Sequence, residues 1–533
     1  MRTVMTAILV FALLMPFSVW GQQEDQNSGI SLHQAALLGN LDAVKKDIES
    51  GTDLNQKDQY GSTPLIIAST FGKTEVAKAL IDAGADMEIS DSNGSTPLLI
   101  ATFFGRTEIV KALLDNGVNK YARNNSGATA LDIASTPFED DKSLYDQLGA
   151  ALGPLGLKLD YNQIKSARKE IATMLRPRPE ELAAVDYKPI TGSDWKISTP
   201  EAQGLDPMLV AELYNEAAHL KTIYGLLVIK NGQLIAEGYF NKVSVNQLSK
   251  RASVTKSYVS AMVGLAMKEG CLSSVDQKMI DFFPEVEGQI TDQRKKDITI
   301  RQMLEMRDGY PWEETDSVYW NTIWAGKYIH PIVDIPLAAD PGTRFQYSNL
   351  TSDWLGIIVA RACNTDLKTF GQKHLFEPLG VTLGDWTRDL DGYYVGSGDI
   401  EFTARDMAKF GLLYLHDGEY DGKQLIPAGW VKASLRNYSD DITSAGVKSG
   451  KVGRYLYNIG YGYQWWNAKS GEHHFEYAWG HGGQFIALLK DLDMVIVITA
   501  DPFYGKEEHF RAWKYEQAHL NLMGKFIKSL PTK

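Results

Sequence analysis

Two residues suited to nucleophilic chemistry, Ser253 and Lys256, stand three positions apart in this sequence. On a helix, positions i and i+3 share one face about one turn apart, so the hydroxyl and the amine would be neighbours. A serine hydroxyl is a weak nucleophile until a base takes its proton, and a lysine can act as that base once burial lowers its pKa. The apolar run at residues 259–267 predicts such burial. The pair therefore predicts a serine nucleophile with a lysine base.

The Ser-x-x-Lys pattern alone is weak, because two other segments match it. Ser166 and Lys169 lie in a charged helical stretch, and Ser193 and Lys196 lie in a segment rich in Pro and Gly. Neither pair has an apolar helix behind it. Only Ser253 is expected at the first turn of a buried helix, where the positive end of the helix dipole favours the negative charge that develops in acyl transfer.

A tyrosine two positions before an asparagine is the second candidate motif, and it also occurs more than once. Tyr239 falls inside an expected hairpin, and Tyr319 falls inside an aromatic-rich loop. Tyr347 lies in a turn that opens with the Pro-Gly pair at 341–342 and leads into a helix, a setting that can hold a phenol over a cleft. We therefore select Tyr347, together with Asn349, as the second motif.

These motifs occur in the order, and with the flanking residues, of a known family. Residues from about 194 to 530 resemble the class C β-lactamase and D-alanyl-D-alanine carboxypeptidase family, in particular its branch with 6-aminohexanoate-dimer hydrolase and related esterases. The matching segments are residues 251–256, 303–306, 341–342 before 347–349, 398–400 with 403–411, and His481-Gly482-Gly483-Gln484. The resemblance implies an α/β domain of the β-lactamase/transpeptidase type, with an antiparallel sheet flanked by helices and a helical subdomain.

The resemblance also implies a role for each motif residue. Ser253 would be the acylated nucleophile, Lys256 its base, and Tyr347 the proton relay to the leaving group and later to water. Asn349 would orient either the Lys256 amine or the substrate amide. The backbone N–H groups of Ser253 and Gln484 would form the oxyanion hole.

The third motif departs from the family pattern. Where β-lactamases and many transpeptidases carry Lys-Thr-Gly, this chain has His481-Gly482-Gly483 as its substrate-binding segment, without a permanent cation or a hydroxyl. In that family these groups bind the substrate carboxylate, so we rank esterase or amidase activity ahead of β-lactamase activity. No metal or other cofactor is implied, since His473-His474 is an isolated pair without the spaced partners that a zinc site needs.

Several elements are expected to position these residues. A helix capped at Asp206-Pro207 is expected to run to about residue 220, and Asn231-Gly232 should join two strands as a hairpin, at 225–229 and 234–240. Later helices are expected at 274–283, 299–306, 351–363 and about 507–529, and later strands at 460–467, 475–479, 484–489 and 494–499. The loop with Tyr310, Trp312, Tyr319, Trp320 and Trp324 either packs or lines a pocket, and the sequence leaves both open.

Upstream of this domain the chain repeats itself. Leu32, Leu65, Leu98 and Leu131 are spaced by 33 residues (65 minus 32, 98 minus 65, and 131 minus 98). Each unit reads as a helix that begins at Ser or Thr, with Pro in its first turn at Pro64 and Pro97, then a turn at Gly72 or Gly105, then a second helix. The pattern resembles ankyrin repeats, whose stacking buries a core that no single unit can bury. The family resemblance implies a surface that docks a protein partner.

The expected repeat array is all-α and extends over residues 29–176. The unit at 31–36 is expected to cap its start, where His33 should hold a turn and bind no metal. Residues 135–156 interrupt the last unit before a helical stretch at 161–175 that would close the array. A linker is expected at 177–193, followed by the hydrolase domain at 194–533.

Composition and the first residues restrict where the protein acts. The chain has 533 residues, 44% of them hydrophobic, enough for two or more globular domains. Its net charge of −12 argues against a nucleic-acid partner. Residues 1–21 read as a secretory signal peptide, whose apolar run is shorter than the ~20 residues of a membrane anchor. We therefore expect a protein exported to the periplasm or beyond, without stable membrane insertion after cleavage. Cys271 and Cys363 could pair there, which the sequence leaves open.

Two functions of different class remain possible. The first is an exported serine hydrolase that cleaves a small amide or ester through an acyl-enzyme on Ser253, with the repeats docking a protein. The second is a catalytically idle protein of this fold that binds or senses through its repeats. In that case Ser253 is a helix N-cap, Tyr347 a core tyrosine and His481 a turn residue. All three polar motifs are intact, which favours the enzyme.

Overall fold

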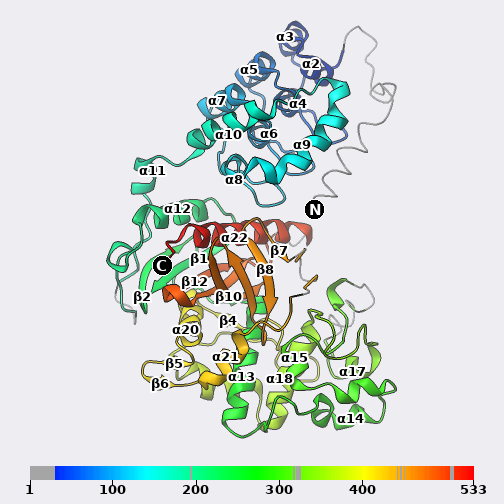
Figure 1. The fold of residues 1–533 in the computed structure, drawn as a ribbon, viewed down its shortest axis with the longest axis vertical. Coiled ribbons are helices and arrows are strands. Elements are labelled where there is room, and N and C mark those ends of the chain that lie inside the picture. Colours follow the sequence, from blue (N-terminus) through cyan, green and yellow to red (C-terminus); the bar gives the residue numbers. More distant parts are fainter. Residues whose placement is uncertain are drawn as a thin grey trace. The chain divides into compact units, whose positions relative to one another are not determined.

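The computed structural model describes residues 30–191, 195–315, 319, 326–440, 442–443, 447–448, 450–504 and 509–532. The chain divides into two compact units, residues 1–178 and 179–533, and each is considered by itself (Figure 1). The predicted signal peptide at residues 1–21 lies outside the described residues, as do Ser193, Trp320 and Trp324.

The first unit is a stack of helix pairs, which confirms the predicted ankyrin array. Neighbouring repeats contact each other through their first helices and through their second helices, and α10 packs on α7 and α8 to close the array. The bounds are α2 (Leu32–Leu38), α3 (Leu41–Glu49), α4 (Pro64–Phe71), α5 (Thr74–Asp82), α6 (Pro97–Phe103), α7 (Thr107–Asp115), α8 (Ala130–Ser135), α9 (Phe138–Leu152) and α10 (Tyr161–Leu175). The interrupting segment at 135–156 is thus largely a helix of its own, α9.

The repeated residues of this unit cap helices, end them or fill the core between them. Thr63 caps α4, its Oγ1 accepting a hydrogen bond from Ile66 N at 3.3 Å. Gly72 ends the same helix at a φ of 66°, a left-handed conformation that favours glycine. Leu65 is fully buried between helices. His33 Nε2 lies 3.2 Å from Ser62 O in the next repeat, so it holds a turn as expected.

The second unit is built on an antiparallel sheet with the strand order β2-β1-β12-β11-β10-β9-β8-β7. The bounds are β1 (Ile223–Lys230), β2 (Gln233–Tyr239), β7 (Lys451–Val452), β8 (Leu456–Tyr461), β9 (Trp466–Ser470), β10 (His473–Gly480), β11 (Gln484–Leu489) and β12 (Met494–Ala500). Two short pairs lie outside it, β3 (Ser249–Lys250) with β4 (Glu401–Phe402) and β5 (Glu419–Tyr420) with β6 (Lys423–Gln424).

Helices cover both faces of this sheet (Figure 1). Along β1, Leu226 and Val228 pack in a core with α12 and α22, whereas Leu227 and Ile229 pack in a second core with α13, α18 and α20. The alternation follows from the two-residue period of a strand. The helices are α11 (Pro179–Ala183), α12 (Pro207–Ala218), α13 (Thr255–Lys268), α14 (Pro284–Glu287), α15 (Ile300–Leu304), α17 (Pro331–Asp334), α18 (Asn349–Ala362), α19 (Leu367–Gly371), α20 (Ala404–Leu415), α21 (Ala428–Leu435) and α22 (His509–Ser529).

The predicted hairpin is confirmed, since Asn231 and Gly232 both have positive φ, 50° and 68°, as a two-residue turn between β1 and β2 requires. Two other predicted elements are wrong. The α-helix expected at 274–283 is instead a turn followed by a short 3₁₀ helix, Met279–Phe282. The backbone before and at the start of that short helix bonds to residues 298–300, including Met279 N to Ile298 O at 2.8 Å. The strand expected at 460–467 is instead the end of β8, a turn and the start of β9.

Part of the segment expected as a linker is packed on the second unit. β2 is an edge strand of the sheet. Its Glu237 N donates to Tyr187 O at 2.9 Å, and its Leu234 N donates to Lys196 O at 2.8 Å. The Glu237 carboxylate accepts from Ile190 N at 2.9 Å. Residues from both sides of the predicted boundary therefore cover an edge whose donors would otherwise lack partners.

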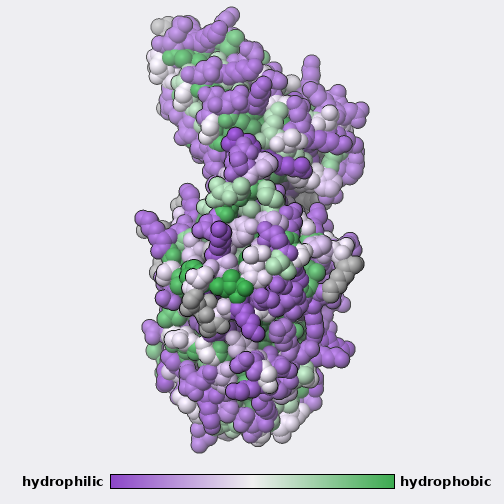
Figure 2. Space-filling view, turned by 90° about the vertical axis from the view of Figure 1, so that its left-hand side faces the viewer, coloured by the Kyte–Doolittle hydropathy of each residue, from purple (hydrophilic) through white to green (hydrophobic). Residues whose placement is uncertain are grey.

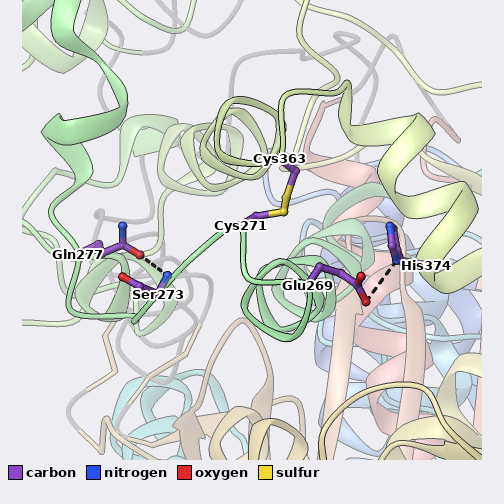
Figure 3. The surroundings of a disulfide bond; sticks show 6 residues. All are labelled: Glu269, Cys271, Ser273, Gln277, Cys363 and His374. Carbon is purple, nitrogen blue, oxygen red and sulfur yellow. Dashed lines mark hydrogen bonds and ion pairs between the residues drawn. A yellow bond between two sulfur atoms is a disulfide. The ribbon is translucent and has the colours of Figure 1, made fainter.

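A disulfide joins Cys271, just after α13, to Cys363, at the end of α18 (Figure 3). It closes a loop with a sequence separation of 92 residues. Beside it, His374 Nδ1 lies 3.5 Å from Glu269 Oε1. The pairing that the sequence left open is therefore present, and it ties together the ends of two long buried helices.

The surface of both units is largely hydrophilic on the face that Figure 2 presents, with apolar residues in separate small areas. None of the helices in the described part of the chain has both the length and the apolar composition that crossing a bilayer requires.

Candidate active site

The candidate nucleophile, Ser253, lies in a tight turn before the helix and not in the α-helix itself. Ser253 belongs to the 3₁₀ turn Ala252–Val254, and α13 begins at Thr255. Side chains at i and i+3 nearly eclipse in a 3₁₀ turn, so Lys256 still lies beside the serine. Ala252 has a φ of 44°, a strained conformation that residues with a Cβ rarely adopt outside turns and functional sites. Ser253 is half-buried, which leaves its hydroxyl accessible.

Lys256 is the buried centre of the site. Only 1% of it is exposed, and its Nζ lies 3.0 Å from Ser253 Oγ, 2.7 Å from Asn349 Oδ1 and 2.9 Å from Ser397 O. Burial lowers the pKa of the Lys256 amine to about 8, against the opposing effect of the Asp353 carboxylate. A neutral amine has two protons and one lone pair. Asn349 and Ser397 accept the two protons, which directs the lone pair at the serine hydroxyl.

Tyr347 lies over the same group, at the N-terminal end of α18. The Lys256 Nζ is 5.0 Å from the centroid of its ring, and the ring stacks on Trp466 at 5.8 Å. Burial raises the pKa of Tyr347 well above its usual value, and a hydrogen bond with Ser253 only partly opposes that effect. The hydroxyl is therefore a phenol at neutral pH and can donate a proton to a leaving group.

The third motif is a turn between β10 and β11. Gly482 and Gly483 have φ values of 83° and 88°, so glycines suit both positions. His481 Nδ1 lies 3.3 Å from Glu516 Oε2, and that hydrogen bond raises the pKa of His481. The imidazole stays protonated to higher pH, but the buried glutamate neutralises its charge.

Gln484 joins the third motif to the nucleophile turn through its side chain. Its Oε1 accepts from Arg251 Nη1 at 2.9 Å, and its Nε2 donates to Lys250 O at 2.9 Å. Gly480 allows this approach, since a Cβ there would lie 2.5 Å from Arg251 O. The segment that carries Ser253 N and the strand that carries Gln484 N are thus neighbours, as an oxyanion hole formed by their N–H groups requires.

Buried carboxyl groups surround the motifs, and the sequence did not single them out. Asp353 accepts from Ser397 N at 2.8 Å and so holds the carbonyl that faces Lys256. Glu313 accepts from Ser348 Oγ at 2.9 Å and from Leu350 N at 2.8 Å, which fixes the turn between Tyr347 and α18. Burial raises the pKa of Glu313 to about 8.

Glu516 acts in the same way on the third motif. It accepts from Trp479 Nε1 at 2.6 Å and from Gly482 N at 3.0 Å. The only sequence signal for any of these carboxyl groups is Asp353, which stands four residues after Asn349 on one helix face.

The other candidates that the sequence offered lie apart from this cluster. Tyr239 Oη donates to Glu237 at 2.6 Å, and Ser166 and Lys169 belong to α10 of the first unit. Of the aromatic loop, Tyr310 is core, since it is buried and its hydroxyl donates to Ile332 O at 2.8 Å. Among the described residues no metal-ligating side chains are grouped in threes.

Family models match both units. One described as "Beta-lactamase" matches residues 217–521. One described as "Ankyrin repeats (3 copies)" matches residues 32–124 and 84–136.

Among curated proteins, 6-aminohexanoate-dimer hydrolase of Paenarthrobacter ureafaciens is 26% identical over 259 residues, 45% of this chain and 63% of that protein. Beta-lactamase-like protein 2 of Dictyostelium discoideum is 23% identical over 201 residues, 37% of this chain and 34% of its own. Lovastatin esterase of Penicillium rubens is 27% identical over 132 residues, 22% of this chain and 33% of its own. The matches thus span less than two thirds of these relatives.

Solved structures with similar folds include a penicillin-binding protein from Bacillus halodurans, with a TM-score of 0.43 and 17% identity over 58% of this chain and 99% of that one. Simvastatin synthase from Aspergillus terreus gives a TM-score of 0.45 and 16% identity over 60% of this chain and 99% of its own.

Proposed function

The chain belongs to the beta-lactamase family, and from this membership we propose that its second unit is a serine hydrolase that cleaves an ester or amide through an acyl-enzyme on Ser253. The observation that carries the proposal is the contact of 3.0 Å between Lys256 Nζ and Ser253 Oγ, at a lysine whose pKa burial lowers to about 8. A lysine at the protein surface would hold its proton too tightly to serve as a base.

In the acylation step, Lys256 Nζ takes the proton of Ser253 Oγ as the oxygen attacks the substrate carbonyl carbon. The carbonyl oxygen becomes negatively charged and is held by the N–H groups of Ser253 and Gln484. When the C–O or C–N bond to the leaving group breaks, the leaving atom takes a proton from Tyr347. The phenol regains it from the Lys256 ammonium, and the products are the acyl-serine and a neutral alcohol or amine.

Deacylation repeats these steps with water in place of the leaving group. Tyr347 and Lys256 accept the proton of the attacking water, which forms the new C–O bond, and Ser253 Oγ leaves with a proton returned by the same pair. Asn349 keeps the amine in place throughout, because its Oδ1 accepts from Lys256 Nζ at 2.7 Å.

The charge around the third motif favours ester or amide substrates over β-lactam substrates. A penicillin carries a carboxylate, and its recognition needs a cation near this motif. His481 is held by Glu516, 3.3 Å away, so the pair presents no net positive charge to a substrate. We therefore rank esterase or amidase activity ahead of β-lactamase activity.

We also propose that the protein is exported to the periplasm or beyond and that its ankyrin repeats dock a protein partner. The Cys271–Cys363 disulfide supports export, because disulfides persist mainly in oxidising compartments. Stacking alone accounts for the consensus residues of the repeats, so the docking role rests on the family and not on a particular surface.

The test is one preparation of the full-length protein assayed against a 4-nitrophenyl ester, a small anilide and nitrocefin, with Ser253→Ala as the blank. We expect kcat/KM for the ester or the anilide to exceed that for nitrocefin at pH 8. Faster hydrolysis of nitrocefin would identify a β-lactamase. A protein that turns over none of the three and fails to react with a serine-directed phosphonate would contradict hydrolase function.

A further inference from the structure

Two consecutive glutamates, one buried and one exposed, accept hydrogen bonds from the N-terminal residues of α18. Glu313 is buried and holds Ser348 and the backbone of the helix start. Glu314 is exposed, and its Oε1 accepts from Asn349 Nδ2 at 2.7 Å. The buried Glu313 side chain ties its own segment to the start of α18. The neighbouring Glu314 is therefore held next to Asn349.

The contact with Glu314 places a carboxylate close to the reacting groups. Asn349 donates to Glu314 through its Nδ2 and accepts from Lys256 Nζ through its Oδ1, each at 2.7 Å. Lys256 Nζ is in turn 3.0 Å from Ser253 Oγ. Glu314 is therefore two hydrogen bonds from the base and three from the nucleophile, and it forms the exposed end of this hydrogen-bond series.

The charge of Glu314 acts on all three motifs. Burial has the largest effect on the pKa of Lys256 and of Tyr347, and the hydrogen bond with Glu516 has the largest effect on that of His481. The Glu314 carboxylate also raises each of these three pKa values. A carboxylate whose charge acts on residues of three separate motifs lies near all of them.

In the part of the chain that the structure describes, the other charged groups of the three motifs and their flanks are paired with an opposite charge or buried. His481 pairs with Glu516, Lys250 Nζ lies 3.0 Å from Asp399 Oδ2, and Lys256 is buried. Within the described residues Glu314 takes part in no ion pair, and its partner Asn349 is a neutral amide. Among the described residues, Glu314 therefore adds a negative charge at the mouth of the site without an ion-pair partner.

We propose that Glu314 is a specificity-determining residue that favours substrates with a cationic group, such as an ammonium, a few bonds from the scissile ester or amide. The inference rests on the proposed hydrolase function and names the substrate class of that site. An ammonium that enters the mouth would meet a carboxylate whose one described partner is neutral. A substrate carboxylate at the same place would be repelled, because like charges at short distance repel each other.

The experiment compares 4-nitrophenyl esters of the same shape. The 4-(trimethylammonio)butanoyl ester is cationic, the 5,5-dimethylhexanoyl ester is its neutral carbon isostere, and the monoglutaryl ester is anionic. The same three charges are placed on the alcohol side in a second series of phenyl esters, so that either side of the scissile bond is probed. The measured quantity is the ratio of kcat/KM for the cationic and neutral members of a series, in which any general change in rate cancels.

We expect the wild-type enzyme to prefer the cationic ester over its isostere by about tenfold in at least one series, and to lose this preference as salt is raised. Glu314→Gln should bring the ratio close to one, since glutamine can still accept from Asn349 but has no charge. Glu314→Asp should keep part of the preference, since the charge remains. Glu287→Gln, which removes an equal charge from an exposed position on α14, should leave the wild-type ratio unchanged.

A ratio near one in the wild-type enzyme, or a ratio that Glu314→Gln leaves unchanged in both series, would overturn the role of Glu314. In either case the neutral ester would still be hydrolysed by the wild-type enzyme and not by Ser253→Ala, so the hydrolase function would stand. Failure of all esters, with no labelling of Ser253, would overturn the hydrolase function itself.

Discussion

The two units of this protein use buried polar groups in different ways. In the ankyrin array, polar side chains bond within a repeat or to the neighbouring one, as when Thr63 Oγ1 accepts from Ile66 N and His33 Nε2 contacts Ser62 O. In the hydrolase unit, Lys256 bonds to residues 93 and 141 positions away in the chain. Bonds within and between neighbouring repeats recur with the sequence and stabilise the array. The long-range bonds of the second unit assemble a single site and bury ionisable groups, whose charged forms are then destabilised by the loss of water.

The difference predicts where single substitutions matter most. Removing the base by Lys256→Ala should reduce acylation by several orders of magnitude, because the described site has no other group placed to accept the serine proton. Pre-steady-state kinetics with a chromogenic ester measures this step. Lys169→Ala is the matched control, since Ser166 and Lys169 have the same spacing on α10, and it should leave acylation unchanged. Rates within tenfold of wild type for Lys256→Ala would refute its role.

The phenol should matter less than the base, and we expect Tyr347→Phe to lower kcat by roughly 10²- to 10⁴-fold, the usual contribution of a positioned acid or base. Removing the hydroxyl of Tyr239, which occupies the same Tyr-x-Asn motif but bonds to Glu237, should change kcat only slightly. Steady-state assays of both variants make the comparison. Equal losses in the two would mean that Tyr347 acts through folding and not through proton transfer.

Removing the disulfide should lower the thermal stability of the second unit alone. It closes a loop with a sequence separation of 92 within the second unit alone, and removing such a bond typically costs about 2–5 kcal/mol. We expect Cys271→Ser/Cys363→Ser to lower the unfolding temperature of the hydrolase unit and to leave that of the repeats unchanged. Differential scanning calorimetry measures both transitions. A shift of both transitions together would show that the units do not unfold independently.

Truncation tests the boundary between the units. A truncated protein that begins at Pro179 keeps the hydrogen bonds of Glu237 in β2 to Tyr187 and Ile190. One that begins near Ser193 lacks both partners. Each buried group left without a partner costs about 1–3 kcal/mol, so the longer form should be the more stable in urea and should hydrolyse esters at near the full rate. Equal urea midpoints would mean that residues 179–191 behave as a linker after all.

Acylation should also depend on pH. Lys256 acts as a base only when neutral, and burial lowers its pKa to about 8. Below that value the neutral fraction falls about tenfold per pH unit, so kcat/KM should rise with pH and level off above about 8. A pH–rate profile for a neutral ester measures it. A profile that stays flat between pH 6 and 9 would exclude a titrating lysine as the base.

The sequence predicted what depends on short-range pattern. The 33-residue period gave the repeats, Asn231-Gly232 gave the hairpin, and the apolar run after Lys256 gave the burial of the base. The Ser253–Lys256 pair and the distant Tyr347 were selected by their local settings, and the structure brings them together.

What the sequence did not predict depends on contacts between distant segments. Glu516 and Ser397 have no local pattern that marks them, and only the folded sheet and helices bring them to the site. The expected strand at 460–467 fails for the same reason. Gln464 has a φ of 61°, and its Nε2 donates to Met303 O and Leu304 O, a long-range bond that no local propensity reveals.

The central claim is that the hydrolase unit forms an acyl-enzyme on Ser253. It is tested most directly by treating the intact protein with a fluorophosphonate and mapping the modified residue by mass spectrometry. We predict a single adduct on Ser253, formed faster at pH 8 than at pH 6, and no adduct on Ser253→Ala. An adduct on another serine, or a folded protein that forms none at pH 8, would contradict the claim.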